Sequence, residues 1–188
     1  MGASQGQRRE ETLLALLERL AQVERALLTR QAYHLGLTTL QAQLLMHLSE
    51  RPQGVVSLAE LLSLTPATVS EALSSLEGKG LLFRTKDPKD GRRWILQPTE
   101  DGLHLIQALK SYSDPLLQAL QGVPNREGLL LGLMELLAEL VRQGTVPETG
   151  LCLTCRYLRR EEGFFCSLLR LALTPLDLRL ACPDHTPA

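Results

Sequence analysis

Apolar residues recur at helical spacing over much of the chain. Residues 9–33, 100–121 and 125–143 each place apolar side chains three and four positions apart, which predicts three amphipathic helices. Asp114 and Pro115 are expected to kink the second of them. The third is apolar around most of its circumference, so it must be buried. We expect a partner subunit to cover it, with burial inside its own chain as the alternative.

Shorter elements are predicted between these helices. A helix opens at residues 38–39 and stops before Pro52. Val55 and Val56 are β-branched and predict a short strand. Ser57 can then cap a second helix over residues 57–62. This helix, a tight turn and the helix that begins after Thr65 together predict a helix-turn-helix unit.

The helix that follows has a clear start. Thr65 can cap its N-terminus, and Pro66 suits the first helical position, where no N–H is needed. Val69, Leu73 and Leu76 share one face and predict its contact with the core. The outward positions carry mostly short side chains, which let another surface approach closely. They are Thr65, Ala67, Thr68, Ser70, Glu71, Ser74 and Ser75.

A basic hairpin is predicted next. Residues 81–84 and 94–96 indicate two strands, and Asp90-Gly91 indicates the turn. Five cations and two carboxylates between positions 84 and 93 leave a local charge of +3, whereas the whole chain carries −1. The cations are Arg84, Lys86, Lys89, Arg92 and Arg93. Such a loop suits the phosphate backbone or a narrow minor groove, with a merely solvated hairpin as the alternative.

The order of these elements resembles the winged helix-turn-helix of the MarR family of bacterial transcription regulators. The resemblance covers roughly residues 13–141 and implies a mainly α fold with a small β-wing. Pro98 is one departure, because the family usually has an aliphatic residue there. The matching motifs are Ser57-Leu58-Ala59, Thr68-Val69-Ser70, Leu76-Glu77 before Gly80-Leu81, and Asp87-Pro88 before Asp90-Gly91-Arg92.

Membership in that family would imply how DNA is bound. The helix after Thr65 would read bases in the major groove, and the wing would grip the flanking minor groove, with Asp90 and Arg92 paired. Glu71 would repel phosphates, so it either accepts a hydrogen bond from cytosine or points away. The expected DNA contacts are Thr65, Ala67, Thr68, Ser70, Glu71, Ser74, Arg84, Lys86, Lys89, Asp90, Arg92 and Arg93.

The resemblance also implies a symmetric homodimer built from both ends of the chain. We expect residues 9–33 with 100–143 as the dimerisation region, 38–99 as the DNA-binding domain, 144–151 as a linker and 152–188 as a tail. A dimer would bind a pseudo-palindromic operator with half-sites about 10 bp apart, as a repressor that a small effector relieves. The expected dimer contacts are Leu13, Leu17, Leu20, Leu133, Leu137 and Leu140.

All four cysteines lie in the tail. Cys152 and Cys155 form a Cys-x-x-Cys pair, Cys166 and Cys182 follow, and His185 stands three positions after the last. This spacing predicts a metal site, because a short tail cannot bury enough core to fold alone. Zinc would use three thiolates with Cys182 or His185, and an iron–sulfur cluster would use all four thiolates. Thiol switching without metal and four inert cysteines are the alternatives.

Composition narrows the class of protein. A chain of 188 residues with 44% hydrophobic content has room for one domain with an appendage. It lacks an apolar run of about 18 residues, and its N-terminus is unlike a signal peptide, so we expect a cytoplasmic protein that no membrane holds. A thiol oxidoreductase would need its Cys-x-x-Cys in a βαβ context, so we expect no enzyme. A winged helix serving only as a protein-binding scaffold is the remaining alternative.

Overall fold

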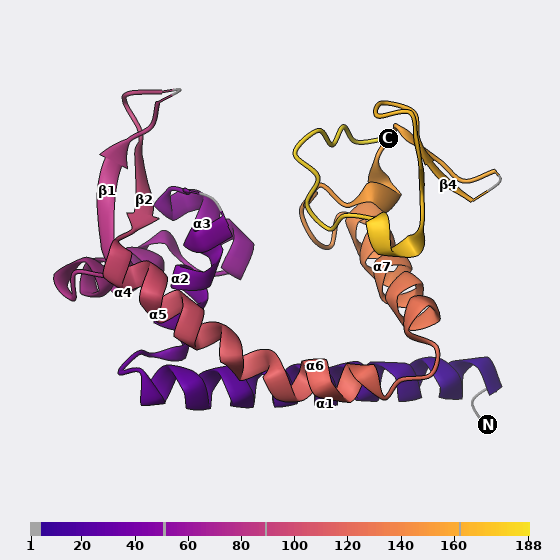
Figure 1. The fold of residues 1–188 in the computed structure, drawn as a ribbon, viewed down its shortest axis with the longest axis horizontal. Helices are drawn as coiled ribbons and strands as arrows, with labels where there is room; N and C mark the ends of the chain where they lie inside the picture. The colour runs from indigo at the N-terminus through magenta and orange to yellow at the C-terminus, as the bar shows by residue number, and fades with distance from the viewer. Residues whose placement is uncertain (1–4, 51, 89, 162) are drawn as a thin grey trace. The chain divides into compact units, whose positions relative to one another are not determined.

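The computed structural model describes residues 5–50, 52–88, 90–161 and 163–188. The chain divides into two compact units, one ending at Ala119 and the other spanning Leu120–Ala188 (Figure 1). Among the described residues, no helix combines the length and the apolar character that crossing a membrane requires.

The first unit is a winged helix-turn-helix preceded by a long helix. The 3-10 turn η1 lies directly before Asp114 and Pro115, where a kink is predicted. Strands β1 and β2 pair antiparallel from Leu82 opposite Pro98 to Lys86 opposite Trp94, so Pro98 closes the ladder without breaking it. The elements in chain order are α1 (Gln5–His34), α2 (Thr39–Glu50), α3 (Val55–Leu62), α4 (Pro66–Gly78), β1 (Leu82–Lys86), β2 (Trp94–Pro98), α5 (Glu100–Lys110), η1 (Ser111–Ser113) and α6 (Asp114–Gln121).

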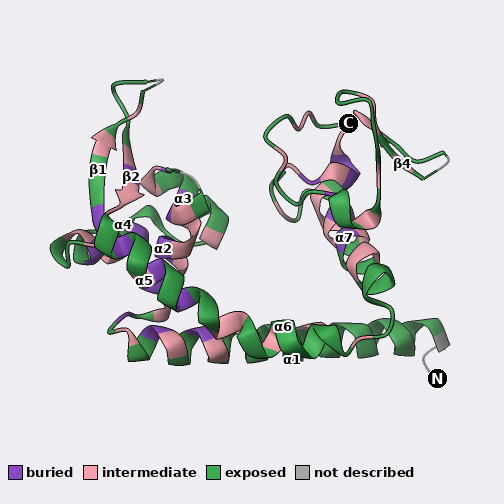
Figure 2. Cartoon of the chain, viewed as in Figure 1, coloured by how far each residue is buried: buried purple, intermediate pink, exposed green. Residues whose placement is uncertain are grey.

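The core of this unit lies among α2, α3, α4, α5 and the base of the wing (Figure 2). The predicted inner face of α4 is confirmed, since Val69, Leu73 and Leu76 are fully buried. Helix α1 joins this core only near its C-terminus, through Leu28 and Ala32. The other large, fully buried side chains are Leu44, Leu45, Leu48, Leu58, Leu96 and Leu109.

The predicted elements between residues 54 and 58 are wrong. Val55 and Val56 form the first turn of α3 instead of a strand, and the N-cap is Gly54 instead of Ser57. The sheet contact occurs earlier, where the Leu96 N–H donates to the Gln53 carbonyl at 2.9 Å. As part of the helix Val55 packs against the core, and this tertiary contact outweighs the strand propensity of two valines.

Gly102 allows α5 to pass close to the start of the wing. A Cβ atom at this position would lie 2.2 Å from the Leu81 carbonyl oxygen, which is main chain and cannot rotate away. The Gly102 N–H also donates to the Thr99 hydroxyl, which caps α5, at 3.1 Å. We expect Gly102→Ala to lower the free energy of unfolding of this unit by about 2 kcal/mol or more. Urea denaturation followed by tryptophan fluorescence would measure the change.

A matched substitution separates this clash from any general effect of alanine. Gly78 is also helical, but a Cβ there meets nothing within 4 Å. Gly78→Ala should therefore leave stability unchanged or raise it by up to about 1 kcal/mol. Equal midpoints for the two variants would contradict the close approach of Gly102 to Leu81.

The second unit packs one helix against the cysteine-rich tail. Asn125 caps α7, its side chain accepting a 2.9 Å hydrogen bond from the Gly128 N–H. The core contains Met134 and Ala138 of α7 with Leu151, Leu153 and Leu178 of the tail. The tail thus covers one face of α7, which sequence reasoning assigned to a partner subunit. The elements are α7 (Arg126–Arg142), η2 (Cys152–Thr154), β3 (Leu158–Arg159), β4 (Phe164–Cys166), β5 (Leu171–Leu173) and η3 (Pro175–Asp177).

Candidate nucleic-acid interface

Helix α4 presents a thin, polar surface to the outside. The Thr65 hydroxyl accepts a hydrogen bond from the Thr68 N–H at 3.2 Å, so the predicted cap is confirmed. With Val69, Leu73 and Leu76 buried, the opposite side is left uncovered. Ser70 is half-buried on this side. The other predicted contact residues are exposed, and they are Thr65, Ala67, Thr68, Glu71 and Ser74.

Polar contacts hold the C-terminal half of α4 in place. The buried side chain of Gln41, on α2, donates to the Ser75 hydroxyl at 2.9 Å. Lys79 donates to the Gly36 carbonyl at 2.7 Å and to the Gln41 side-chain oxygen at 3.3 Å. These contacts fix the angle at which the outer face of α4 is presented. Sequence reasoning missed Gln41, because a helical glutamine carries no signal of burial.

An ion pair ties α4 to the wing. Arg84 on β1 forms two hydrogen bonds with the Glu77 carboxylate, both at 2.7 Å. Hydrogen bonding to Glu77 raises the pKa of the Arg84 guanidinium. Because Nε and Nη2 of Arg84 both bind Glu77, Arg84 fixes the wing on α4, and a contact of Arg84 with DNA stays a prediction. A glutamate seven residues before an arginine is too common a pattern to have revealed this.

The tip of the wing is a basic turn. The Arg93 N–H donates to the Asp90 carbonyl at 2.9 Å, and the Arg92 N–H donates to the Asp90 carboxylate at 3.1 Å. Asp90 thus contacts the main chain of Arg92, while both arginine side chains are exposed. Lys86 lies 4.1 Å from the centre of the Trp94 ring, a cation–π contact across the two strands. Lys89 lies outside the described residues.

Comparisons with known proteins agree with this architecture. A family model described as MarR family matches residues 35–93. The transcriptional regulator BldR from Sulfolobus solfataricus is 30% identical, and the match covers 69% of this chain and 96% of BldR with a TM-score of 0.53. This chain belongs to the MarR family. A comparison with curated protein sequences gives no match.

Two further structures share the MarR fold. A variant of S. aureus MepR is 26% identical over 67% of this chain and 96% of its own, with a TM-score of 0.53. A MarR-family regulator from Silicibacter pomeroyi is 24% identical over 68% of this chain and 86% of its own, with a TM-score of 0.57. The family model ends before the first cysteine, so the tail lies outside that part of the MarR pattern.

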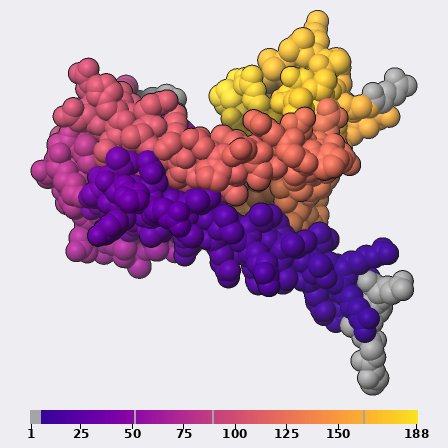
Figure 3. Space-filling model, turned by 60° about the horizontal axis from the view of Figure 1, so that its bottom comes forward, coloured from indigo at the N-terminus to yellow at the C-terminus, as the bar shows by residue number. Residues whose placement is uncertain are grey.

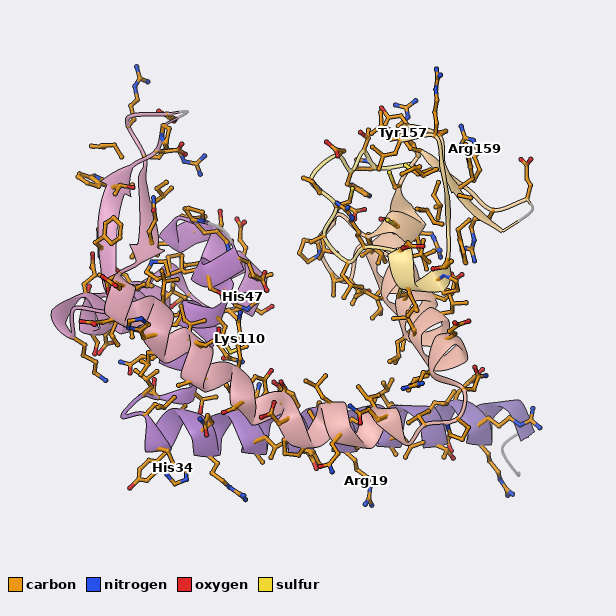
Figure 4. All side chains as sticks on the ribbon, viewed as in Figure 1. Arg19, His34, His47, Lys110, Tyr157 and Arg159 are labelled. Atoms are coloured by element: carbon orange, nitrogen blue, oxygen red, sulfur yellow. The ribbon has the colours of Figure 1, made fainter. Side chains whose placement is uncertain are left out.

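The long helix α1 has an apolar stripe that its own unit leaves uncovered. The exposed fractions of Leu13, Leu16 and Leu20 are 60%, 52% and 55%. Figure 3 shows α1 open along the visible face, and Figure 4 shows Arg19 and His34 projecting from it. Of the other expected dimer contacts, Leu133 is exposed, Leu17, Leu137 and Leu140 are half-buried, and Leu137 packs against the core of the tail. Their role in a dimer stays a prediction.

The four cysteines converge on one cavity in the second unit. Cys152, Cys155, Cys166 and Cys182 are all free thiols, and all four line a pocket of about 30 Å³ together with leucine side chains, Tyr157 and Asp184. Burial raises the pKa of the Cys152 thiol. In the part of the chain that the structure describes, no three metal-ligating side chains stand in a coordinating arrangement. The tail therefore brings the four thiols to one cavity, where they are neither joined in disulfides nor arranged as metal ligands.

His185 belongs to a neighbouring network. Its Nε2 lies 3.2 Å from the Thr154 hydroxyl and 3.6 Å from the Glu148 carboxylate, and its side chain is only 6% exposed. Burial raises the pKa of Glu148, but hydrogen bonds from Thr154 and Gly150 and the charge of His185 outweigh it, so this pKa lies below its usual value. His185 therefore holds the C-terminal segment against Thr154 of η2 and against Glu148, which precedes η2.

Proposed function

We propose that this MarR-family chain is a homodimeric DNA-binding regulator that represses transcription. The observation that carries the proposal is the combination of an exposed, short-chained face on α4 with a basic wing in one folded unit. The ion pair of Glu77 on α4 with Arg84 on β1 holds the wing in a fixed position relative to α4. Membership in a family of transcriptional regulators supports this role over an enzymatic one.

Each part suits one feature of a DNA duplex. Serine and threonine hydroxyls on α4 can contact base edges or phosphates once the helix enters the major groove. Arg92 and Arg93 are exposed at the wing, where arginine suits the negative potential of a narrow minor groove. Glu71 is exposed on α4, so it can accept a hydrogen bond from cytosine N4.

The dimer in this proposal rests on the uncovered stripe of α1. A contiguous apolar surface of this kind on a folded unit marks a protein interface. Two-fold symmetry would place two copies of α4 in successive major grooves, so the operator should be pseudo-palindromic with half-sites about 10 bp apart. Binding at a promoter would then block transcription.

Titration of the chain with its own upstream DNA at several salt concentrations tests DNA binding. The dissociation constant should rise steeply with salt, because the basic wing displaces condensed counterions. Arg92→Ala should weaken binding and reduce the logarithmic salt slope by about 1; if Arg92 contacts a phosphate the loss should be alike for all sequences, and if it enters a narrow minor groove the loss should be greatest at sites with a narrow groove. Arg19→Ala removes the same charge from α1 and should change neither quantity.

Sequence preference tests the role of α4 separately. Ser70→Ala should change the preference at particular base positions of the operator and leave the salt slope as it is. A chain that shows no salt-dependent affinity for any duplex, although folded, would refute DNA binding and favour a protein-binding scaffold.

We further propose that a signal modulates DNA binding, either a small ligand or the state of the tail thiols. The thiols follow α7 closely in sequence, and Cys152 packs against the core that α7 forms with the tail. Operator affinity of Cys152→Ser and Cys155→Ser, compared with that of the parent chain with and without chelator, tests the second route. Unchanged affinity throughout would exclude the tail as a sensor.

A further inference from the structure

We propose that the tail binds a single zinc ion through the thiolates of Cys152, Cys155, Cys166 and Cys182. The inference concerns the second unit alone and does not depend on DNA binding by the first.

Main-chain hydrogen bonds bring the thiols together from separate segments. The Cys152 N–H donates to the Arg179 carbonyl at 2.9 Å, and the Cys182 N–H donates to the Gly150 carbonyl at 2.8 Å. Cys166 pairs with Leu158 in the register of β3 and β4, which brings it beside the segment that starts at Cys155. Every cysteine of the chain therefore faces one cavity, and no sulfur is spent on a disulfide.

The Cys152 sulfur already accepts a hydrogen bond of the kind that metal-bound thiolates accept. The Arg179 N–H donates to the Cys152 sulfur at 3.2 Å. Hydrogen bonds of this kind orient metal ligands and stabilise their charge. The loop from Arg179 to Cys182 thus supports one thiol and supplies another, so its position would be coupled to the ion.

The fourth ligand is Cys182 and not His185. His185 Nε2 is engaged by Thr154 and Glu148, and the imidazole is almost fully covered. Cys182 lines the same cavity as the other three thiols. Thr154 lies between Cys152 and Cys155 in the sequence. Its hydrogen bonds with Glu148 and His185 would therefore hold the first cysteine pair in position without contacting the ion.

The cavity favours one ion over a cluster. The space of about 30 Å³ between the lining side chains has room for roughly two water-sized spheres, whereas an iron–sulfur cluster inserts several iron and sulfide atoms between the thiolates. Zinc takes four sulfurs at about 2.3 Å in a tetrahedron. The free thiols are not yet in that arrangement, so binding would draw them inward and release four protons to solvent.

The unit also needs a cross-link. Strands β3, β4 and β5 have two, three and three residues, and among the described residues of the tail only Leu151, Leu153 and Leu178 are buried hydrophobics. So small a core supplies little stability, and an ion that joins three segments would supply more. Tyr157 and Arg159, which Figure 4 labels, mark the segment that leads from the first cysteine pair into β3.

Metal analysis of the full chain, purified anaerobically under reducing conditions, tests the proposal. We expect one zinc per chain, without iron or sulfide. Titration with a mercurial thiol reagent should release that zinc in step with four thiols, a result that needs no variant. Cobalt in place of zinc should give the sulfur-to-metal charge-transfer bands and intense visible bands of a tetrahedral thiolate site.

Variants then assign the ligands. Cys182→Ser should lose the cobalt charge-transfer intensity of one thiolate, whereas His185→Gln should keep the whole spectrum and the zinc content. Hydrogen exchange of the parent chain should rise in residues 148–188 on chelation and stay constant in residues 55–98. A chain that takes up no metal, one that holds iron with sulfide, or one whose cysteines pair as disulfides under reducing conditions would overturn the proposal.

Discussion

Leu20→Glu is expected to convert the proposed dimer into a monomer without unfolding the chain. Leu20 is 55% exposed in its own unit, so the substitution removes little from the core. In a two-fold dimer each change occurs twice. A dimer can bury only the exposed 55% of each Leu20 side chain, so losing both contacts costs about 1.5–3 kcal/mol, which corresponds to a roughly 10- to 10²-fold weaker dimer. Two carboxylates facing the same seam would weaken it further.

Sedimentation over a range of concentrations would measure the dimer dissociation constant directly. Gln22→Glu is the matched control, because it adds the same charge to an exposed position of the same helix. It should leave the dimer intact. Operator affinity should fall with Leu20→Glu alone, since a monomer presents one copy of α4. If the Leu20→Glu chain still sediments as a dimer, the apolar stripe of α1 does not form the dimer interface.

Local signals in the sequence predicted the winged helix well. A cap at Thr65 with proline behind it, a periodic face ending at Leu76 and an Asp-Gly turn each act within a few residues, and each is present in the structure. Val55 and Val56 failed because their conformation depends on Gln53 pairing with Leu96, a contact 43 positions apart in the chain. Propensity cannot register a contact at such a distance.

In the candidate sites, too, local patterns were predictable from the sequence and contacts between distant residues were not. Spacing alone indicated that the cysteines act together, and the structure places all four on one cavity. Spacing left Cys182 and His185 equivalent, however, because their distinction lies in Glu148, which precedes the cysteines and carries no motif. Likewise the basic wing was visible in the sequence, but the engagement of Arg84 by Glu77 was not. Partner choice among charged side chains is decided by the fold.

Leu73→Ala should cause a large loss of stability in the DNA-binding unit. Leu73 is fully buried on α4, within a core that also contains residues of α2 and α3. Truncation would leave a cavity, because helices held by their own hydrogen bonds close around it only in part. We expect the free energy of unfolding to fall by about 2–5 kcal/mol. That is a large share of the 5–15 kcal/mol typical of a domain.

Trp94 is the only tryptophan of the chain and lies in β2, so its fluorescence reports the first unit without interference from the tail. Denaturation should be compared at one protein concentration, because a dimer gains stability with concentration. Leu73→Met keeps the volume and should cost less than about 1.5 kcal/mol. If Leu73→Ala and Leu73→Met lowered the free energy of unfolding equally, α4 would not pack against this core through Leu73. Its outer face would then have no fixed angle at which to meet DNA.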